Sequence, residues 1–201
     1  MKKILTLPAG NPVEFRWTNR KGVKKRFLIP GSLWVTIVTM LLMALTFAYA
    51  KTLTWQIGVG VTLMLLIHEL GHLYAAKKCG YLASVPIFIP YLGAAVICPQ
   101  ILRSRNEAYV GYYGPLFAAI ASINLLLFTI LWPGHHHDVA LVNQASLSVN
   151  VFNMIPLRFL DGGRILAKNA SPRRHHADWV RCYVILTVGQ IALWVIQAFY
   201  Y

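Results

Sequence analysis

The stretch LIHELGHLYAAKKCG, residues 66–80, places three ionisable side chains in an otherwise apolar run. His68 and His72 are four residues apart, so a helix puts both imidazoles on one face, close enough to share one metal ion. Glu69 follows His68 directly and is able to act beside such an ion without binding it. The pattern therefore predicts a metal-binding helix, and the rest of the chain is interpreted around it.

Long segments without charge recur along the 201 residues. The mean hydropathy is +0.55 and 12% of the residues are charged, about half the share of an ordinary soluble protein. A helix needs roughly 20 apolar residues to cross a bilayer. The sequence therefore predicts an all-α polytopic membrane protein with about five transmembrane helices, the first of which is a membrane anchor. The predicted spans are about 29–50, 53–77, 109–132, 139–157 and 182–201.

The apolar segment 79–102 does not fit a straight transmembrane helix. It contains Pro86, Pro90 and Pro99, and proline removes a backbone donor and disfavours a helical conformation in the residue before it. A short re-entrant or β-hairpin-like membrane segment fits better. Since non-helical backbone at membrane depth must be buried in protein or line a wet cavity, this segment predicts a cavity beside the second helix.

The net charge of +13 is distributed unevenly between the two sides of the predicted membrane. With five spans and a cytosolic N-terminus, the cytosolic segments hold 18 of the 19 Lys and Arg, eight of them in the basic leader 1–28. This is the positive-inside pattern of membrane proteins. Contact with the lipid bilayer then accounts for the basic charge, and no nucleic-acid partner is expected. The leader itself is expected to form a small hairpin.

Zinc is the simplest partner for the two histidines and the glutamate, because a charged side chain in the hydrocarbon costs about 2.5–3.5 kcal/mol or more. A catalytic zinc ion usually has three protein ligands. Among the six acidic residues, Asp161 is the best candidate for the third, because it follows the fourth span at the same cytosolic end as His72. Gly162 and Gly163 follow Asp161 and permit a sharp backbone reversal. The alternative for Asp161 is an ordinary turn aspartate in an Asp-Gly pair.

Three pieces of the chain together resemble one known family, the site-2 proteases or M50 peptidases, which are intramembrane zinc metalloproteases. HELGHLYAAKKCG resembles the zinc helix, GYYGPLFA the glycine-proline entry to the next core helix, and NMIPLRFLDGGRIL the Asn-x-x-Pro and Asp-Gly element. The matching region runs from about residue 53 to 168. The chain departs from the family at Arg158 and Phe159, where prolines are common, so the loop before the Asp-Gly element differs.

The resemblance implies a metalloprotease core over 53–168, with three helices that hold one Zn²⁺ per chain. The re-entrant segment 79–102 would present the substrate in extended form. The implied site residues are the zinc ligands His68, His72 and Asp161, the catalytic base Glu69 and, for the substrate or the oxyanion, Asn153.

The predicted activity is hydrolysis of peptide bonds in or near the transmembrane helices of membrane-protein substrates, by a zinc-activated water with Glu69 as general base. Two alternatives remain. One is a catalytically inactive relative that binds transmembrane helices, and the other is a metal-ion transporter, because ionisable residues in spans also mark ion pathways. The chain fits a prokaryotic plasma membrane, with the active site near the cytosolic side. The sequence indicates neither the substrate nor the oligomeric state.

The fourth span carries four amide side chains, those of Asn143, Gln144, Asn150 and Asn153. They are expected either to line a path by which water reaches the zinc ion or to form hydrogen bonds between helices. In the first role the amides would face the cavity at the zinc ion, and in the second they would contact polar groups of other helices.

Overall fold

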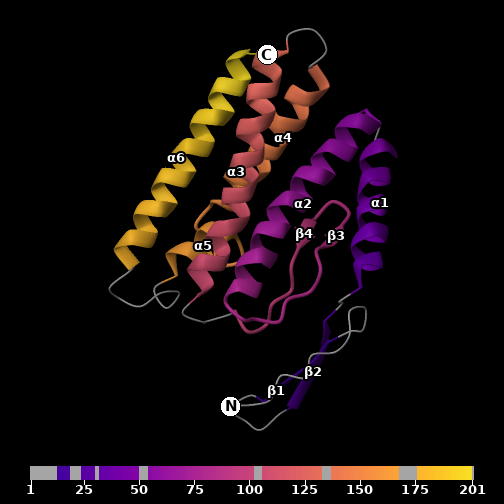
Figure 1. Ribbon diagram of the computed structural model, residues 1–201, viewed down its shortest axis with the longest axis vertical. Coiled ribbons are helices and arrows are strands. Elements are labelled where there is room, and N and C mark those ends of the chain that lie inside the picture. Colours follow the sequence, from indigo (N-terminus) through magenta and orange to yellow (C-terminus); the bar gives the residue numbers. More distant parts are fainter. Residues whose placement is uncertain are drawn as a thin grey trace.

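The computed structural model describes residues 13–18, 24–29, 32–49, 54–101, 106–132, 137–167 and 176–200. Over these residues the chain is mostly helical, which confirms the predicted all-α class (Figure 1). In chain order the elements are β1 (Val13–Thr18), β2 (Lys24–Ile29), α1 (Leu33–Tyr49), α2 (Trp55–Lys78), β3 (Ile87–Ile89), β4 (Gly93–Ala95), α3 (Glu107–Leu131), α4 (His137–Asn153), α5 (Asp161–Leu166) and α6 (His176–Tyr200).

Each of the five predicted spans overlaps one of these helices. By length and composition, α2, α3 and α6 are able to cross a membrane. Helices α1 and α4 have 17 residues each, which is the lower end of the range for a spanning helix. Helix α4 stops at Asn153, before the predicted end at 157, because Pro156 lacks a backbone donor and disfavours a helical residue before it.

Helix α2, which carries the HELGH motif, is capped at both ends. Thr54 precedes the first turn, and its hydroxyl oxygen accepts a hydrogen bond from the Ile57 amide at 3.4 Å. At the other end Gly80 has a φ of 74°, and its amide and that of the next residue donate to carbonyls of the last helical turn. This is a Schellman motif, in which glycine readily adopts the left-handed conformation. The chain therefore turns sharply away from α2.

The segment after α2 forms an antiparallel hairpin of β3 and β4, which confirms the predicted β-hairpin-like segment. Helix α1 contacts β3, and α2 contacts β4. The hydroxyl of Thr36 donates to the Pro86 carbonyl at 2.8 Å, and the hydroxyl oxygen of Thr39 accepts from the Phe88 amide at 3.2 Å. Helix α1 thus occupies the outer edge of β3, and the other edge of the hairpin belongs to β4.

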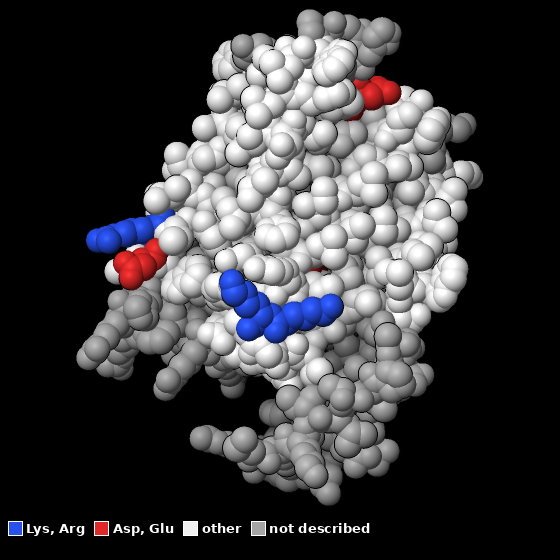
Figure 2. Space-filling model, viewed as in Figure 1, with Lys and Arg blue, Asp and Glu red and all other residues white. Residues whose placement is uncertain are grey.

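Consecutive long helices run in opposite directions, so α2 ends, and α1, α3 and α6 begin, toward the lower end of the helices in Figure 1, while α4 runs in the same direction as α2. Helix α2 packs against α1, α3 and α4, and α3 also contacts α5 and α6. On the face shown in Figure 2, the exposed Lys and Arg side chains lie over the lower half, with a broad band of uncharged residues above them. A band of this kind fits the hydrocarbon core of a bilayer.

The basic leader contains the antiparallel hairpin of β1 and β2, as expected. The rest of the leader, 1–12 and 19–23, lies outside the described residues. Several basic residues that assign the cytosolic side, in 102–105 and 168–175, also lie outside them. The orientation in the membrane therefore stays a prediction.

Helices α2 and α3 approach each other closely at two glycines. A Cβ at Gly71 would overlap the Tyr113 carbonyl, and a Cβ at Gly114 would overlap the imidazole of His72. Small residues let helix backbones approach in this way. The glycine of HELGH and the second glycine of GYYGP therefore bring α3 against the face of α2 that carries the histidines.

Candidate metal centre

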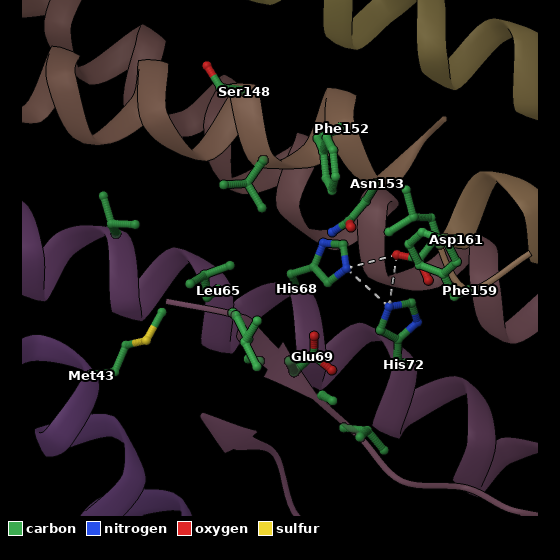
Figure 3. A pocket seen from close by; sticks show the side chains of 18 of the residues that line it. Met43, Leu65, His68, Glu69, His72, Ser148, Phe152, Asn153, Phe159 and Asp161 are labelled. Atoms are coloured by element: carbon green, nitrogen blue, oxygen red, sulfur yellow. Dashed lines mark hydrogen bonds and ion pairs between the residues drawn. The ribbon is translucent and has the colours of Figure 1, made fainter. Parts of the chain in front are cut away.

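Helices α2 and α5 bring His68, His72 and Asp161 together, and all three side chains are buried (Figure 3). The Nε2 atoms of the two histidines are 3.1 Å apart. Asp161 Oδ2 lies 3.0 Å from His68 Nε2 and 3.2 Å from His72 Nε2. Three atoms of the kind that bind metal ions therefore converge on one point.

These distances fit one tetrahedral zinc ion. Zinc lies about 2.0–2.2 Å from imidazole nitrogen and carboxylate oxygen, so tetrahedral ligand atoms are about 3.4 Å from one another. The three observed separations, 3.0, 3.1 and 3.2 Å, are close to that spacing. Two imidazoles and a carboxylate are also a known ligand set for catalytic zinc, which keeps its fourth position for water or substrate.

The second ring nitrogen of each histidine faces an oxygen on a neighbouring helix. His72 Nδ1 lies 2.8 Å from the Val110 carbonyl, and His68 Nδ1 lies 2.9 Å from Asn150 Oδ1. These oxygens only accept hydrogen bonds, so the geometry suits neutral imidazoles that carry the hydrogen on Nδ1 and present the lone pair of Nε2 toward Asp161. A metal ion between the two Nε2 lone pairs and the carboxylate oxygen would bind all three atoms at once, so the donor set fits such an ion.

The other carboxylate oxygen of Asp161 faces a cation. Arg164 Nη1 lies 3.6 Å from Asp161 Oδ1, while Oδ2 faces the histidines. Arg164 is one helical turn after Asp161 on α5. The guanidinium keeps its charge under all ordinary conditions, so it holds the carboxylate from the side opposite the imidazoles.

Asp161 is the first residue of α5, and close backbone packing puts it at the metal centre. Gly162 and Gly163, which would permit a sharp reversal, instead lie inside the helix. A Cβ at Gly162 would overlap the Met154 carbonyl, and one at Gly163 would overlap the Leu157 carbonyl. The glycines therefore let α5 pack directly on the backbone of the loop after α4, which carries Asp161 toward α2.

A cavity of about 790 Å³ lies beside the three residues, as predicted for the region next to the second helix. Glu69 and Asn153 both line it (Figure 3). Glu69 is buried, and its carboxylate points into the cavity beside the imidazoles. The structure therefore brings all five candidate site residues to one cavity. Much of the remaining wall is apolar, formed by Met43, Phe47, Val61, Leu65, Val149 and Phe152.

The four amides of α4 have different contacts. Asn143 links α4 to its neighbours, since it donates to a carbonyl of α3 at 3.1 Å and to Gln197 of α6 at 3.0 Å. Asn150 contacts His68, and Gln144 lines a separate cavity of about 170 Å³. Of the four, Asn153 alone lines the cavity at the metal centre. Hydrogen bonding between helices therefore explains Asn143, and the expected water path is limited to Asn153.

Three groups at the centre were not found by sequence reasoning. The Val110 carbonyl is main chain and leaves no signal in the sequence. Asn150 was noted only as a polar residue of the fourth span. The spacing of Asp161 and Arg164, i and i+3, is a signal for a contact on a helix, but it is visible only once residues 161–166 are known to be helical.

Gly114→Ala is expected to weaken zinc binding by about 10-fold or more, the scale seen when the groups that orient a ligand are disturbed. The added methyl group would occupy space taken by the His72 imidazole. Zinc content and affinity of the purified variant measure the effect. Gly189→Ala in α6 is the control, because no atom lies within 4 Å of its Cβ position apart from its chain neighbours and the adjacent backbone of its own helix. Equal zinc affinity in the two variants would contradict the close packing at His72.

No family model matches the chain. Curated proteins with similar sequences include the zinc metalloprotease MJ0392 of Methanocaldococcus jannaschii, which is 29% identical over 143 residues, 69% of this chain and 42% of that protein. A protein of Mycobacterium tuberculosis, named provisionally as zinc metalloprotease Rip3, is 26% identical over 144 residues, 66% of this chain and 36% of that protein. The chain thus spans less than half the length of these relatives.

Proposed function

We propose that the chain is an intramembrane zinc metalloprotease of the site-2 protease type, which hydrolyses peptide bonds in or near transmembrane helices of membrane proteins. The observation that carries the proposal is the convergence of His68, His72 and Asp161 next to Glu69 at the wall of one cavity. Three helices that are able to cross a membrane support it. The relatives named zinc metalloproteases support it as well.

His68 and His72, through Nε2, and Asp161, through Oδ2, would hold one Zn²⁺ per chain. When bound in such a site, zinc lowers the pKa of a water ligand to about 7 and polarises a substrate carbonyl. The contacts of the two Nδ1 atoms would keep both imidazoles in the tautomer that this binding requires.

Glu69 would serve as the general base. Its carboxylate points into the cavity beside the two imidazoles, where it is able to take a proton from the attacking water and deliver it to the leaving amine. Asn153 lines the same cavity, and its amide nitrogen would donate a hydrogen bond to the oxygen of the scissile carbonyl as negative charge develops there.

Strand β4 would bind the substrate in extended form. Helix α1 occupies the outer edge of β3, whereas the residues of β4 line the cavity. These residues are Gly93, Ala94 and Ala95, whose small side chains leave room for a peptide to pair with the strand. A substrate helix must unwind first, because its peptide groups are otherwise engaged in the helical ladder. Glycine or proline near the cut would ease this step.

Two alternative functions are less well supported. A metal-ion transporter would need metal-binding groups at successive depths, but the described residues contain a single group of three side chains that could hold a metal ion. A catalytically inactive relative that binds transmembrane helices does not need a base beside the metal, and here Glu69 is buried at the cavity wall. Proteolysis therefore accounts for more of the site than either alternative.

We infer that the N-terminus and the metal centre face the cytosol, in a prokaryotic plasma membrane. His72 is about 9 Å along α2 from the end of that helix at Lys78. Lys77 and Lys78 are in the last turn there, and positive charge is typical of cytosolic ends of membrane helices.

The purified full chain in liposomes is expected to cleave a single-span fluorogenic peptide with Gly-Pro at its centre. Removal of zinc with a chelator should stop cleavage, and added Zn²⁺ should restore it, because the ligand set is that of a zinc site. The control peptide has Leu-Leu in place of Gly-Pro and should be cleaved more slowly. Cleavage that continues at the same rate after complete zinc removal would rule out the proposed metalloprotease.

A further inference from the structure

We propose that Asn150 is a positioning residue that holds His68 in the tautomer able to bind the metal ion. The proposal rests on the zinc centre of the proposed function. It assigns to α4 a role in metal binding that is separate from substrate contact, since Asn150 is not part of the cavity wall.

The geometry gives Asn150 one polar contact with the site. Its Oδ1 lies 2.9 Å from His68 Nδ1, and the side chain is 2% exposed. With the amide in this orientation, His68 carries its hydrogen on Nδ1, and Nε2 is free to bind the metal. With the amide reversed, the nitrogen would donate to Nδ1, and the hydrogen would move to Nε2, which could then no longer act as a ligand.

Packing alone does not explain an amide at this position. Asn150 Nδ2 is buried and has no hydrogen-bond partner within the part of the chain that the structure describes. An unpaired buried donor is unfavourable, and a leucine of similar size would avoid it. The oxygen of the amide is the atom that has a partner, so the contact with His68 accounts for the residue.

Asn150 completes a set of three supports behind the three ligand atoms. The Val110 carbonyl of α3 holds His72, Arg164 of α5 faces Asp161, and Asn150 of α4 holds His68. The Val110 carbonyl is main chain and Arg164 is charged, whereas Asn150 acts through an uncharged side chain. A substitution therefore removes its acceptor oxygen without changing the charge of the site. This makes its contribution to metal affinity measurable.

The experiment compares zinc affinity of the full chain in detergent, measured by competition with a chromophoric chelator. Asn150→Leu, which has no acceptor, is expected to bind zinc about 10–100-fold more weakly, the usual effect of losing such a partner. Asn150→Asp has the same shape and only accepts hydrogen bonds, so it should keep wild-type affinity or bind more tightly. Asn150→Ala is a second acceptor-free variant and should behave as Asn150→Leu does.

Asn143→Leu is the matched control. Asn143 is a fully buried amide of the same helix, but it bonds to α3 and α6. Its replacement is expected to lower the thermal stability of the zinc-free protein and to leave zinc affinity unchanged. Thermal unfolding of the zinc-free Asn150 variants separates a loss of folding from a loss of metal binding.

The outcomes are distinct. Weak binding by both Asn150→Leu and Asn150→Ala, together with tight binding by Asn150→Asp, supports the positioning role. Wild-type affinity in an acceptor-free variant, or an equal loss in Asn150→Asp, overturns it, because a purely structural amide would not be replaced by a buried carboxylate. A wild-type chain that binds no zinc would overturn the proposed function itself, and this inference with it.

Discussion

Glu69→Gln is expected to lower peptide hydrolysis by about 10²–10⁴-fold, the usual contribution of a positioned general base. Glutamine has nearly the same shape as glutamate but does not take up a proton. Zinc content should not change, because Glu69 is not among the three converging ligand atoms. The measurements are the cleavage rate of the single-span peptide in liposomes and the zinc content of the same preparation.

Glu107→Gln is the matched control for this prediction. Glu107 is as deeply buried as Glu69, at the start of α3, but it is not part of the cavity wall. Its variant is expected to retain cleavage. If Glu69→Gln cleaved at the wild-type rate, the general base would have to be another residue. If it lost its zinc, Glu69 would belong to the ligand set.

Asp161→Ala is expected to weaken zinc binding by more than about 100-fold, beyond the range for partners outside the ligand set. The variant leaves two imidazoles on α2 without the carboxylate that lies 3.0 and 3.2 Å from them. Cleavage should be lost at ordinary zinc concentrations and should return in part when zinc is raised. Zinc affinity and the dependence of cleavage on added zinc are the measurements.

Asp178→Ala provides the comparison for Asp161→Ala. Asp178 is also in the first turn of a helix, α6, and its side chain is 61% exposed, 3.7 Å from Arg181. Its replacement should change neither zinc affinity nor cleavage. Equal zinc affinity in the two variants would remove Asp161 from the ligand set and would leave the metal centre without a third protein ligand.

The sequence predicts the helices well because each depends on the composition of its own segment. Long uncharged runs favour helices in a membrane, and each predicted span overlaps a helix. The prolines of 79–102 also act locally, and the structure has a hairpin there. Helix ends are predicted less well, as at Asn153, because one proline and the loop after it decide where the ladder stops.

The candidate site also combines residues that the sequence identifies with contacts that it does not reveal. His68, Glu69 and His72 are evident from spacing along one helix, and Asp161 is found by elimination among six acidic residues. The contact of His68 with Asn150 joins residues 82 positions apart, and no periodicity predicts it. The need for a glycine at position 114 is also not evident from the sequence, since it depends on how closely α3 approaches the His72 ring.

The central claim is that one zinc ion lies among His68, His72 and Asp161. Anomalous diffraction from crystals of the full chain, recorded just above and just below the zinc absorption edge, tests it most directly. We predict one difference peak, present only above the edge, within bonding distance of both Nε2 atoms and of Asp161 Oδ2. A zinc peak elsewhere in the chain, or none at this position in zinc-loaded crystals, would contradict the account.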